Sequence, residues 1–220
     1  MNKVTETLSI TKLGLILSFF GPPLLLVPFQ LLAPKPLTDS IVLLRELLFF
    51  LLAGVLILII IKGEELNLQS VGIHSRHWGK SILWTLFLLL MFYIVVAGCL
   101  GIFQLIGISF GQEDGKYTNI SSWVLTVVML RAGVVEELFY RGYIMERLYK
   151  ITNNRIIYLI TPSIIFGLLH YRQGIGGIII ATATGLLFSY FYWRKRDLKI
   201  NIMAHFLADF IPNVLIPMIN

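Results

Sequence analysis

Long apolar stretches separated by short polar ones divide the chain from end to end. Seven of them stand out, at residues 13–33, 41–61, 81–109, 121–146, 156–170, 174–193 and 200–219. About 20 helical residues cross the hydrocarbon core of a bilayer, so the pattern predicts an all-α transmembrane bundle of seven membrane helices. An eighth would result if 81–109 were split near Gly98 or Gly101. Stretch 156–170 reaches only about 22 Å as a helix, and short helices of this kind are tolerated where they line a protein cavity.

The composition supports a membrane protein with a single transmembrane domain, residues 1–220. Hydrophobic residues make up 57% of the chain and charged residues only 14%, whereas soluble domains have about 25% charged residues. The single cysteine, Cys99, lies in an apolar stretch and cannot form an internal disulfide. No short apolar region near the start is followed by a small-residue cleavage site, so the first apolar stretch is expected to remain as an anchor.

Basic residues between the apolar stretches indicate how the chain crosses the membrane. Alternate loops differ sharply in lysine and arginine, with twelve in one set and three in the other. Basic loops stay in the cytoplasm, so the N-terminus is predicted to be cytoplasmic. The net charge of +6 then reflects topology and gives no sign of nucleic-acid binding. The twelve are Lys3, Lys12, Lys62, Arg76, Lys80, Arg147, Lys150, Arg155, Arg194, Lys195, Arg196 and Lys199, and the three are Lys35, Lys116 and Arg172.

Small side chains recur at every fourth position of stretch 174–193. This spacing lets membrane helices approach closely, so the stretch is expected to pack tightly against a neighbour. The residues are Gly177, Ala181, Gly185 and Ser189.

Two adjacent carboxylates and an arginine interrupt stretch 121–146. Each charge in hydrocarbon costs roughly 3 kcal/mol or more, so ionisable groups here indicate function. Glu137 and Arg141 are four residues apart on one helix face, where they can form a charge-assisted pair. Glu136 is displaced from Glu137 by about 100° and is expected to remain uncompensated. A Glu–Arg pair alone could be structural, but the second glutamate favours a functional site.

Two later stretches supply further ionisable groups. His170 ends the sequence FGLLH, and a lone histidine at a helix end is more often structural than catalytic. His205 and Asp209 are four residues apart in HFLAD, so Asp209 could fix the tautomer of the His205 ring, or both could face a bound group. The alternative is a mutually satisfied polar pair that locks two helices together.

These groups together have the chemistry needed to hydrolyse a bond. They can polarise a water, accept its proton and stabilise an oxyanion. They could also bind zinc, with Glu136, His170 and His205 as candidate ligands, although no spacing requires a metal. A covalent nucleophile is not evident, because Cys99 has no partner pattern and neither G-x-S-x-G nor H-E-x-x-H occurs. The candidate catalytic residues are Glu136, Glu137, Arg141, His170, His205 and Asp209.

Three motifs in this order resemble the CAAX-prenyl-protease and bacteriocin-processing family of intramembrane endopeptidases, also called the abortive-infection family. The family pattern is EExxxR, then FxxxH, then HxxxN or HxxxD. This chain has EELFYR at 136–141, FGLLH at 166–170 and HFLAD at 205–209. The resemblance covers about the last 90 residues, and the motif-bearing catalytic core is 121–220. It implies an enzyme that cuts a peptide or a membrane-associated protein within the bilayer.

The resemblance also implies a role for each motif residue. Glu136 would be the general base that activates water, with help from His170. Glu137 and Arg141 would orient the site. His205 and Asp209 would bind the developing oxyanion or the substrate carbonyl. Both metal-dependent and metal-free mechanisms have been argued for this family, and the sequence leaves that choice open.

The cellular setting and the competing functions follow from the same reasoning. The short loops suggest a bacterial plasma-membrane enzyme, and the site is expected to face the cytosol. The family is associated with bacteriocin maturation or self-immunity. A non-catalytic immunity or signalling partner with the same fold is therefore the main alternative. A small transporter that uses the acids as a proton relay would predict internal repeats, and none is evident in the sequence.

Overall fold

The computed structural model describes residues 3–33, 36–74, 78–108 and 119–219, with side chains from Leu8 onward. Every regular element in these ranges is helical. Lys35, Arg76 and Lys116, which enter the count of loop charges, lie outside the described residues. The elements are α1 (Lys3–Leu32), α2 (Asp39–Leu58), η1 (Ile59–Gly63), η2 (Leu68–Val71), α3 (Trp78–Ile106), α4 (Ser122–Arg131), η3 (Ala132–Glu136), η4 (Leu138–Met145), α5 (Glu146–Thr152), α6 (Arg155–Leu168), η5 (Tyr171–Gln173), α7 (Gly174–Lys195), α8 (Leu198–Phe210), η6 (Ile211–Leu215) and α9 (Ile216–Ile219).

Five helices among the described residues are long and apolar enough to cross a membrane. The predicted all-α fold is therefore confirmed, whereas the predicted count of seven or eight membrane helices is not. Helix α3 runs without a break through Gly98 and Gly101, so the split that would have added an eighth helix is not seen. Helix α6 is apolar but short. The five spans are 8–32, 39–63, 78–106, 171–195 and 198–219.

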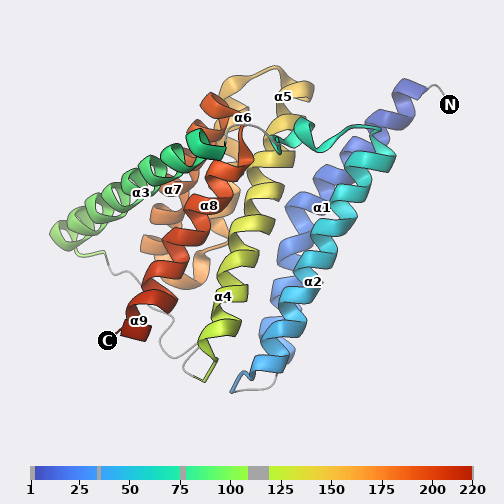
Figure 1. Cartoon of the computed structure of the whole chain (residues 1–220). Coiled ribbons are helices and arrows are strands. Elements are labelled where there is room, and N and C mark those ends of the chain that lie inside the picture. Colours follow the sequence, from blue (N-terminus) through green and yellow to red (C-terminus); the bar gives the residue numbers. More distant parts are fainter. Residues whose placement is uncertain (1–2, 34–35, 75–77, 109–118, 220) are drawn as a thin grey trace.

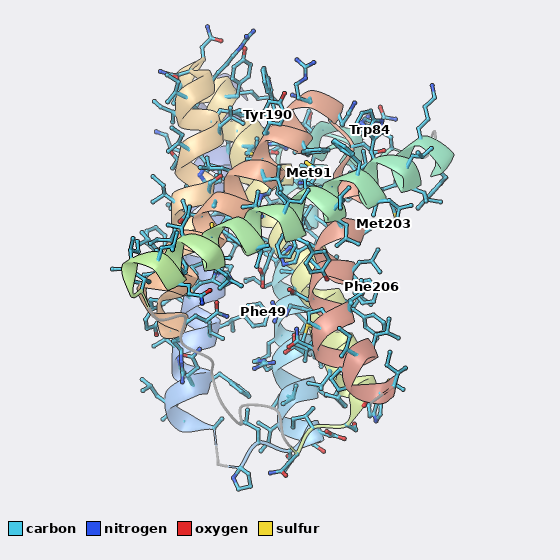
Figure 2. All side chains as sticks on the ribbon, turned by 90° about the vertical axis from the view of Figure 1, so that its left-hand side faces the viewer. Phe49, Trp84, Met91, Tyr190, Met203 and Phe206 are labelled. Atoms are coloured by element: carbon cyan, nitrogen blue, oxygen red, sulfur yellow. The ribbon has the colours of Figure 1, made fainter. Side chains whose placement is uncertain are left out.

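The helices form a bundle with the segment α4–η3–η4 at its centre (Figure 1). Helices α1 and α2 pack against each other on one side of this segment, and α8 lies on its other side. Helix α3 crosses the outer face of α7 and α8 at a steep angle (Figure 2). The central segment thus contacts elements from both halves of the chain, which places its side chains in the core.

One end of the bundle gathers the start of α1, the segment after η1, α5 and the turn between α7 and α8 (Figure 1). Buried polar contacts join these parts. The Glu64 carboxylate accepts a hydrogen bond from Arg147 Nε at 3.0 Å, and Leu198 N donates to Gly72 O at 2.8 Å. Burial opposes ionisation of Glu64, but its contacts with Arg147 outweigh this effect and hold its pKa below the usual value. We call this the basic end of the bundle, because Lys62, Lys150 and residues 194–199 lie here.

Two sharp turns at the basic end have the same local chemistry. Asn153 and Arg196 adopt positive φ angles of 48° and 50° after α5 and α7, a conformation that often ends helices. The next residue then caps the following helix. Asn154 accepts hydrogen bonds from two backbone amides of α6, and Asp197 accepts one from Lys199 N of α8.

The small-residue stripe of α7 packs as its spacing predicts. Its four members are buried or nearly so, and α6 and α7 form the most extensive helix pair in the described structure. Ser189 Oγ lies 3.0 Å from Ser163 Oγ of α6. A Cβ added to Gly185 would lie 3.3 Å from the Arg141 guanidinium. The stripe therefore brings α6 and the central segment close to α7.

Close packing at Gly133 gives a stability test. A Cβ there would lie 2.8 Å from Ile202 O of α8, which is backbone and cannot rotate away. We expect Gly133→Ala to destabilise the protein by about 1–3 kcal/mol through overpacking. Gly98→Ala is the matched control, because a Cβ at Gly98 meets nothing within 4 Å and alanine is favoured in a helix interior. In thermal denaturation in detergent, Gly133→Ala should have a lower unfolding midpoint than the wild type, and Gly98→Ala should not. Equal midpoints for the two variants would contradict this packing.

Candidate functional site

The central segment widens into π-helical turns at the motif that carries the two glutamates. Elements η3 and η4 occupy residues 132–136 and 138–145, and π-helical turns pair residues five apart and occur often at functional sites. Arg131 and Glu136 are five residues apart, and Arg131 Nη1 lies 2.6 Å from Glu136 Oε1. In a regular α-helix they would be about 140° apart. The expectation that Glu136 is uncompensated is therefore wrong, because it assumed regular α-helical geometry.

Glu137 is the fully buried centre of a polar network. Arg141 Nη1 donates to its Oε1 at 2.9 Å, which confirms the ion pair predicted from the spacing. His205 Nδ1 donates to the same oxygen at 2.8 Å. Asn201 Nδ2 donates to Oε2 at 3.2 Å. The sequence reasoning missed Asn201, although it lies four residues before His205 on the same face of α8.

Arg141 connects this network to α6 and α7. Its Nη2 donates to Gly185 O at 3.2 Å, and its guanidinium lies 4.6 Å from the centre of the Phe166 ring. A second ring, Phe188, lies 5.7 Å away. The arginine is only 1% exposed, so a carboxylate, a carbonyl and two aromatic faces replace part of its hydration. Its Nε has no hydrogen-bond partner among the described residues.

His205 lies between the carboxylates of three acidic residues. Its Nδ1 is bound to Glu137, because a carboxylate oxygen can only accept. Its Nε2 lies 3.5 Å from Asp209 Oδ2 and 3.9 Å from Glu136 Oε2. The ring is therefore oriented from one side by Glu137, and its other nitrogen points toward Asp209 and Glu136.

His170 follows the end of α6 and is held by its own chain. Its Nδ1 lies 2.8 Å from Phe166 O. A carbonyl can only accept, so Nδ1 carries a proton, and in a neutral ring Nε2 is then the acceptor. The Phe166 ring links the motifs, because its centroid lies 4.7 Å from that of His170 and 6.0 Å from that of His205.

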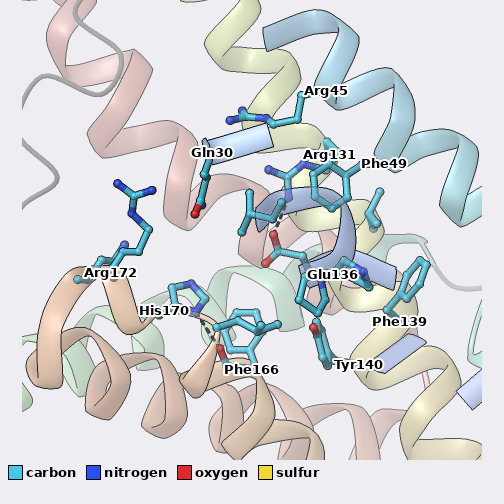
Figure 3. Close-up of a pocket in the computed structure, with 16 residues that line it drawn as sticks. Gln30, Arg45, Phe49, Arg131, Glu136, Phe139, Tyr140, Phe166, His170 and Arg172 are labelled. Atoms are coloured by element: carbon cyan, nitrogen blue, oxygen red, sulfur yellow. Dashed lines mark hydrogen bonds and ion pairs between the residues drawn. The ribbon is translucent and has the colours of Figure 1, made fainter. Parts of the chain in front are cut away.

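A cavity of about 180 Å³ connects Glu136 to His170 (Figure 3). Both side chains line it, as do Arg131, Tyr140 and Phe166. Glu137, Arg141, His205 and Asp209 are not among its lining residues, so four of the six candidates lie behind or beside it. The other lining residues are Pro22, Pro23, Leu26, Gln30, Arg45, Phe49, Val135, Phe139, Leu169, Arg172 and Gln173.

Charged residues of α2 also reach the site, which the sequence reasoning did not foresee. Arg131 Nε lies 2.5 Å from Glu46 Oε2, and Arg45 Nε donates to Glu46 Oε1 at 2.6 Å. Glu46 is 1% exposed. Arg45, Glu46, Arg131 and Glu136 therefore form a chain of alternating charges that ends at the cavity. The sequence signal for this contribution was the adjacent pair Arg45 and Glu46, which are charged residues within the apolar stretch 41–61.

The candidate zinc ligands do not form a ligand set. Among the residues that the structure describes, no group of three or more His, Cys, Asp or Glu side chains lies close enough together to hold a metal ion. His205 Nδ1 is bound to Glu137, and His170 Nδ1 to Phe166 O. These contacts occupy one ring nitrogen of each histidine.

The chain therefore has helices that are long and apolar enough to span a bilayer. It also has a cavity lined by Glu136 and His170. The model of the family described as Type II CAAX prenyl endopeptidase Rce1-like matches residues 118–211. This match confirms the resemblance carried by the three motifs. The family description indicates a membrane protease.

A curated relative from Bacillus subtilis (strain 168), named "Putative membrane peptidase YdiL", is also similar to the chain. It is 28% identical over 139 residues, which cover 60% of this chain and 54% of the relative. The chain thus spans about half the length of that relative. No solved structure matches the chain.

The buried pair at Glu137 predicts a large effect on folding. Glu137→Gln removes the charge that compensates Arg141, and breaking a buried ion pair in this way costs about 3–5 kcal/mol. We expect less protein in the membrane and a lower thermal midpoint in detergent. Glu65→Gln makes the same chemical change at an exposed position and should therefore lower the stability much less than Glu137→Gln. Equal stability of the two variants would contradict the network.

Proposed function

We propose that the protein is an intramembrane endopeptidase that hydrolyses a peptide bond with a water activated by Glu136 and His170. The observation that carries this proposal is that these two motif residues, from segments far apart in the sequence, line one cavity. A carboxylate and an imidazole at one small cavity are the usual groups for activating water by general base catalysis.

Glu136 acts as the base in the proposed reaction. Its carboxylate takes a proton from the water, and the water oxygen attacks the carbonyl carbon of the scissile bond. The carbon–nitrogen bond then breaks as the proton passes from Glu136 to the leaving amine. His170 holds the attacking water through its second ring nitrogen, since Nδ1 is bound to Phe166 O.

His205 stabilises the negative charge that develops on the carbonyl oxygen. The ring lies beside the cavity and carries a proton on both nitrogens in this scheme, so that Nδ1–H donates to Glu137 and Nε2–H donates a hydrogen bond to the oxyanion. Asp209, 3.5 Å from Nε2, orients this nitrogen. Glu137 fixes the ring from the other side, and Arg141 fixes Glu137. Glu137 and Arg141 are then positioning residues, and the carboxylate of Glu136 alone takes part in proton transfer.

The proposed setting is a bacterial plasma membrane with the N-terminus in the cytoplasm. The clustering of lysine and arginine at the basic end supports this orientation. The substrate would be a peptide or a segment of a membrane protein, with a link to bacteriocin maturation or self-immunity. The proposed scheme uses water activated by Glu136 and His170 and assigns no step to zinc.

The test compares the N-terminal peptides of cells that express the wild type or Glu136→Gln at matched levels. The amide keeps the size of the side chain but cannot take up the proton. Loss of a general base lowers the rate by about 100-fold or more, so wild-type cells should contain new peptide termini that Glu136→Gln cells lack. His170→Ala should lose the same termini while still accumulating in the membrane.

Two controls complete this comparison. Glu65→Gln should produce the wild-type set of termini, because its loop is far from the motif residues in sequence and exposed. A chelator added to isolated membranes should leave cleavage intact, and a loss that zinc restores would instead support a metal enzyme. If all strains contain identical termini and Glu136→Gln cells keep the biological phenotype, the protease function is contradicted. The result would then support a non-catalytic immunity or signalling partner.

A further inference from the structure

The cavity lies in the half of the bundle away from the basic end. Its α1 residues, from Pro22 to Gln30, belong to the second half of that helix. Its α2 residues, Arg45 and Phe49, belong to the first three turns after Asp39. Helix α1 ends and α2 begins at the end of the bundle opposite the basic end (Figure 1).

Exposure along the cavity wall shows where it opens. The inner wall is buried, with Val135, Phe139 and Tyr140 at most 1% exposed. Toward the α6–α7 turn and the end of α1 the lining is more exposed, because Arg172 is exposed and Gln173, His170 and Gln30 are partly exposed. The cavity therefore deepens from the α6–α7 turn toward the middle of the central segment, where Glu136 lies.

The short helix α6 is the reason for this opening. It starts at the basic end with Arg155 and has 14 residues, which span about 21 Å. The hydrocarbon core is about 30 Å thick, so the turn that carries His170 stops within the membrane. Glu136 lies near the middle of the helical run from Ser122 to Thr152. Glu136 and the recessed turn that carries His170 line one cavity.

We propose that the site is entered from the non-cytoplasmic side of the membrane. The basic end faces the cytoplasm by the positive-inside rule, and the cavity opens toward the opposite end. This reverses the expectation that the site faces the cytosol. The inference rests on the proposed protease function for its substrate, which is then an exported peptide or a non-cytoplasmic segment of a membrane protein beside the bilayer.

Cysteine labelling in intact cells tests the direction of opening without any activity. Cys99→Ser removes the single native cysteine, and Gln173→Cys or Lys150→Cys is then added. Gln173 lines the cavity near the opening, and Lys150 is exposed at the basic end. A membrane-impermeant maleimide should label Gln173→Cys in intact cells, and Lys150→Cys only after permeabilisation.

Other labelling results would overturn the inference. Labelling of Gln173→Cys only after permeabilisation would place the opening on the cytoplasmic side. Labelling of Lys150→Cys in intact cells would place the basic end outside the cell and remove the basis for the inferred orientation. No labelling of Gln173→Cys under either condition would mean that the cavity does not open there. Leu138→Cys, which is 3% exposed and outside the cavity lining, is the buried control that should stay unlabelled.

The location of the cleaved bonds separates this inference from the function itself. Termini that depend on Glu136 should map to exported peptides or non-cytoplasmic segments. If they all map to cytoplasmic segments, the side of entry is wrong and the protease function stands. If no termini depend on Glu136, the protease function fails, and labelling alone decides which way the cavity opens.

Discussion

Compensation of buried charge is the constraint on which the rest of this structure depends. Glu137 is fully buried and is held by Arg141, His205 and Asn201. The network draws α8 onto the central segment, and Arg141 extends it to α7 through Gly185 O. A charge left unpaired at this depth would cost several kcal/mol. The same contacts that stabilise the fold therefore fix the His205 ring.

Glu136 differs from its neighbour because it belongs to a second set of charges. Arg131 binds it at 2.6 Å, and Glu46 binds Arg131 from α2. Its side chain is 24% exposed, compared with 0% for Glu137. Two adjacent carboxylates thus have separate environments, one enclosed by the fold and one at a cavity. The π-helical turns make this division possible, since they place Arg131 beside Glu136.

Periodicity and spacing predicted the helical fold, the pair of Glu137 with Arg141 and the packing stripe of α7. These features depend on residues within one helix, where geometry follows from sequence separation. The pairing of Arg131 with Glu136 was missed because a switch from α to π turns has no simple sequence signal. The contribution of Glu46 depends on how α2 packs against the central segment, which spacing does not encode. The predicted helix count is not confirmed. Five of the described helices are long and apolar enough to span a membrane, α6 is apolar but shorter, and the run from α4 to α5 is not among the five.

The direction in which the cavity opens could not be predicted from the sequence either. A 15-residue apolar stretch indicated a short helix at a cavity, but not the end of the bundle toward which that cavity would open. The inferred direction rests on Pro22, Gln30 and Arg45, which line the cavity together with residues of the α6–α7 turn.

Glu137 and Glu136 have different roles in this account, because Glu137 maintains the fold whereas Glu136 is the proposed catalytic base. The most direct measurement is the thermal midpoint of purified Glu136→Gln beside wild type and Glu137→Gln. We predict a midpoint close to wild type for Glu136→Gln and a much lower one for Glu137→Gln, whereas equal losses would contradict the division of roles.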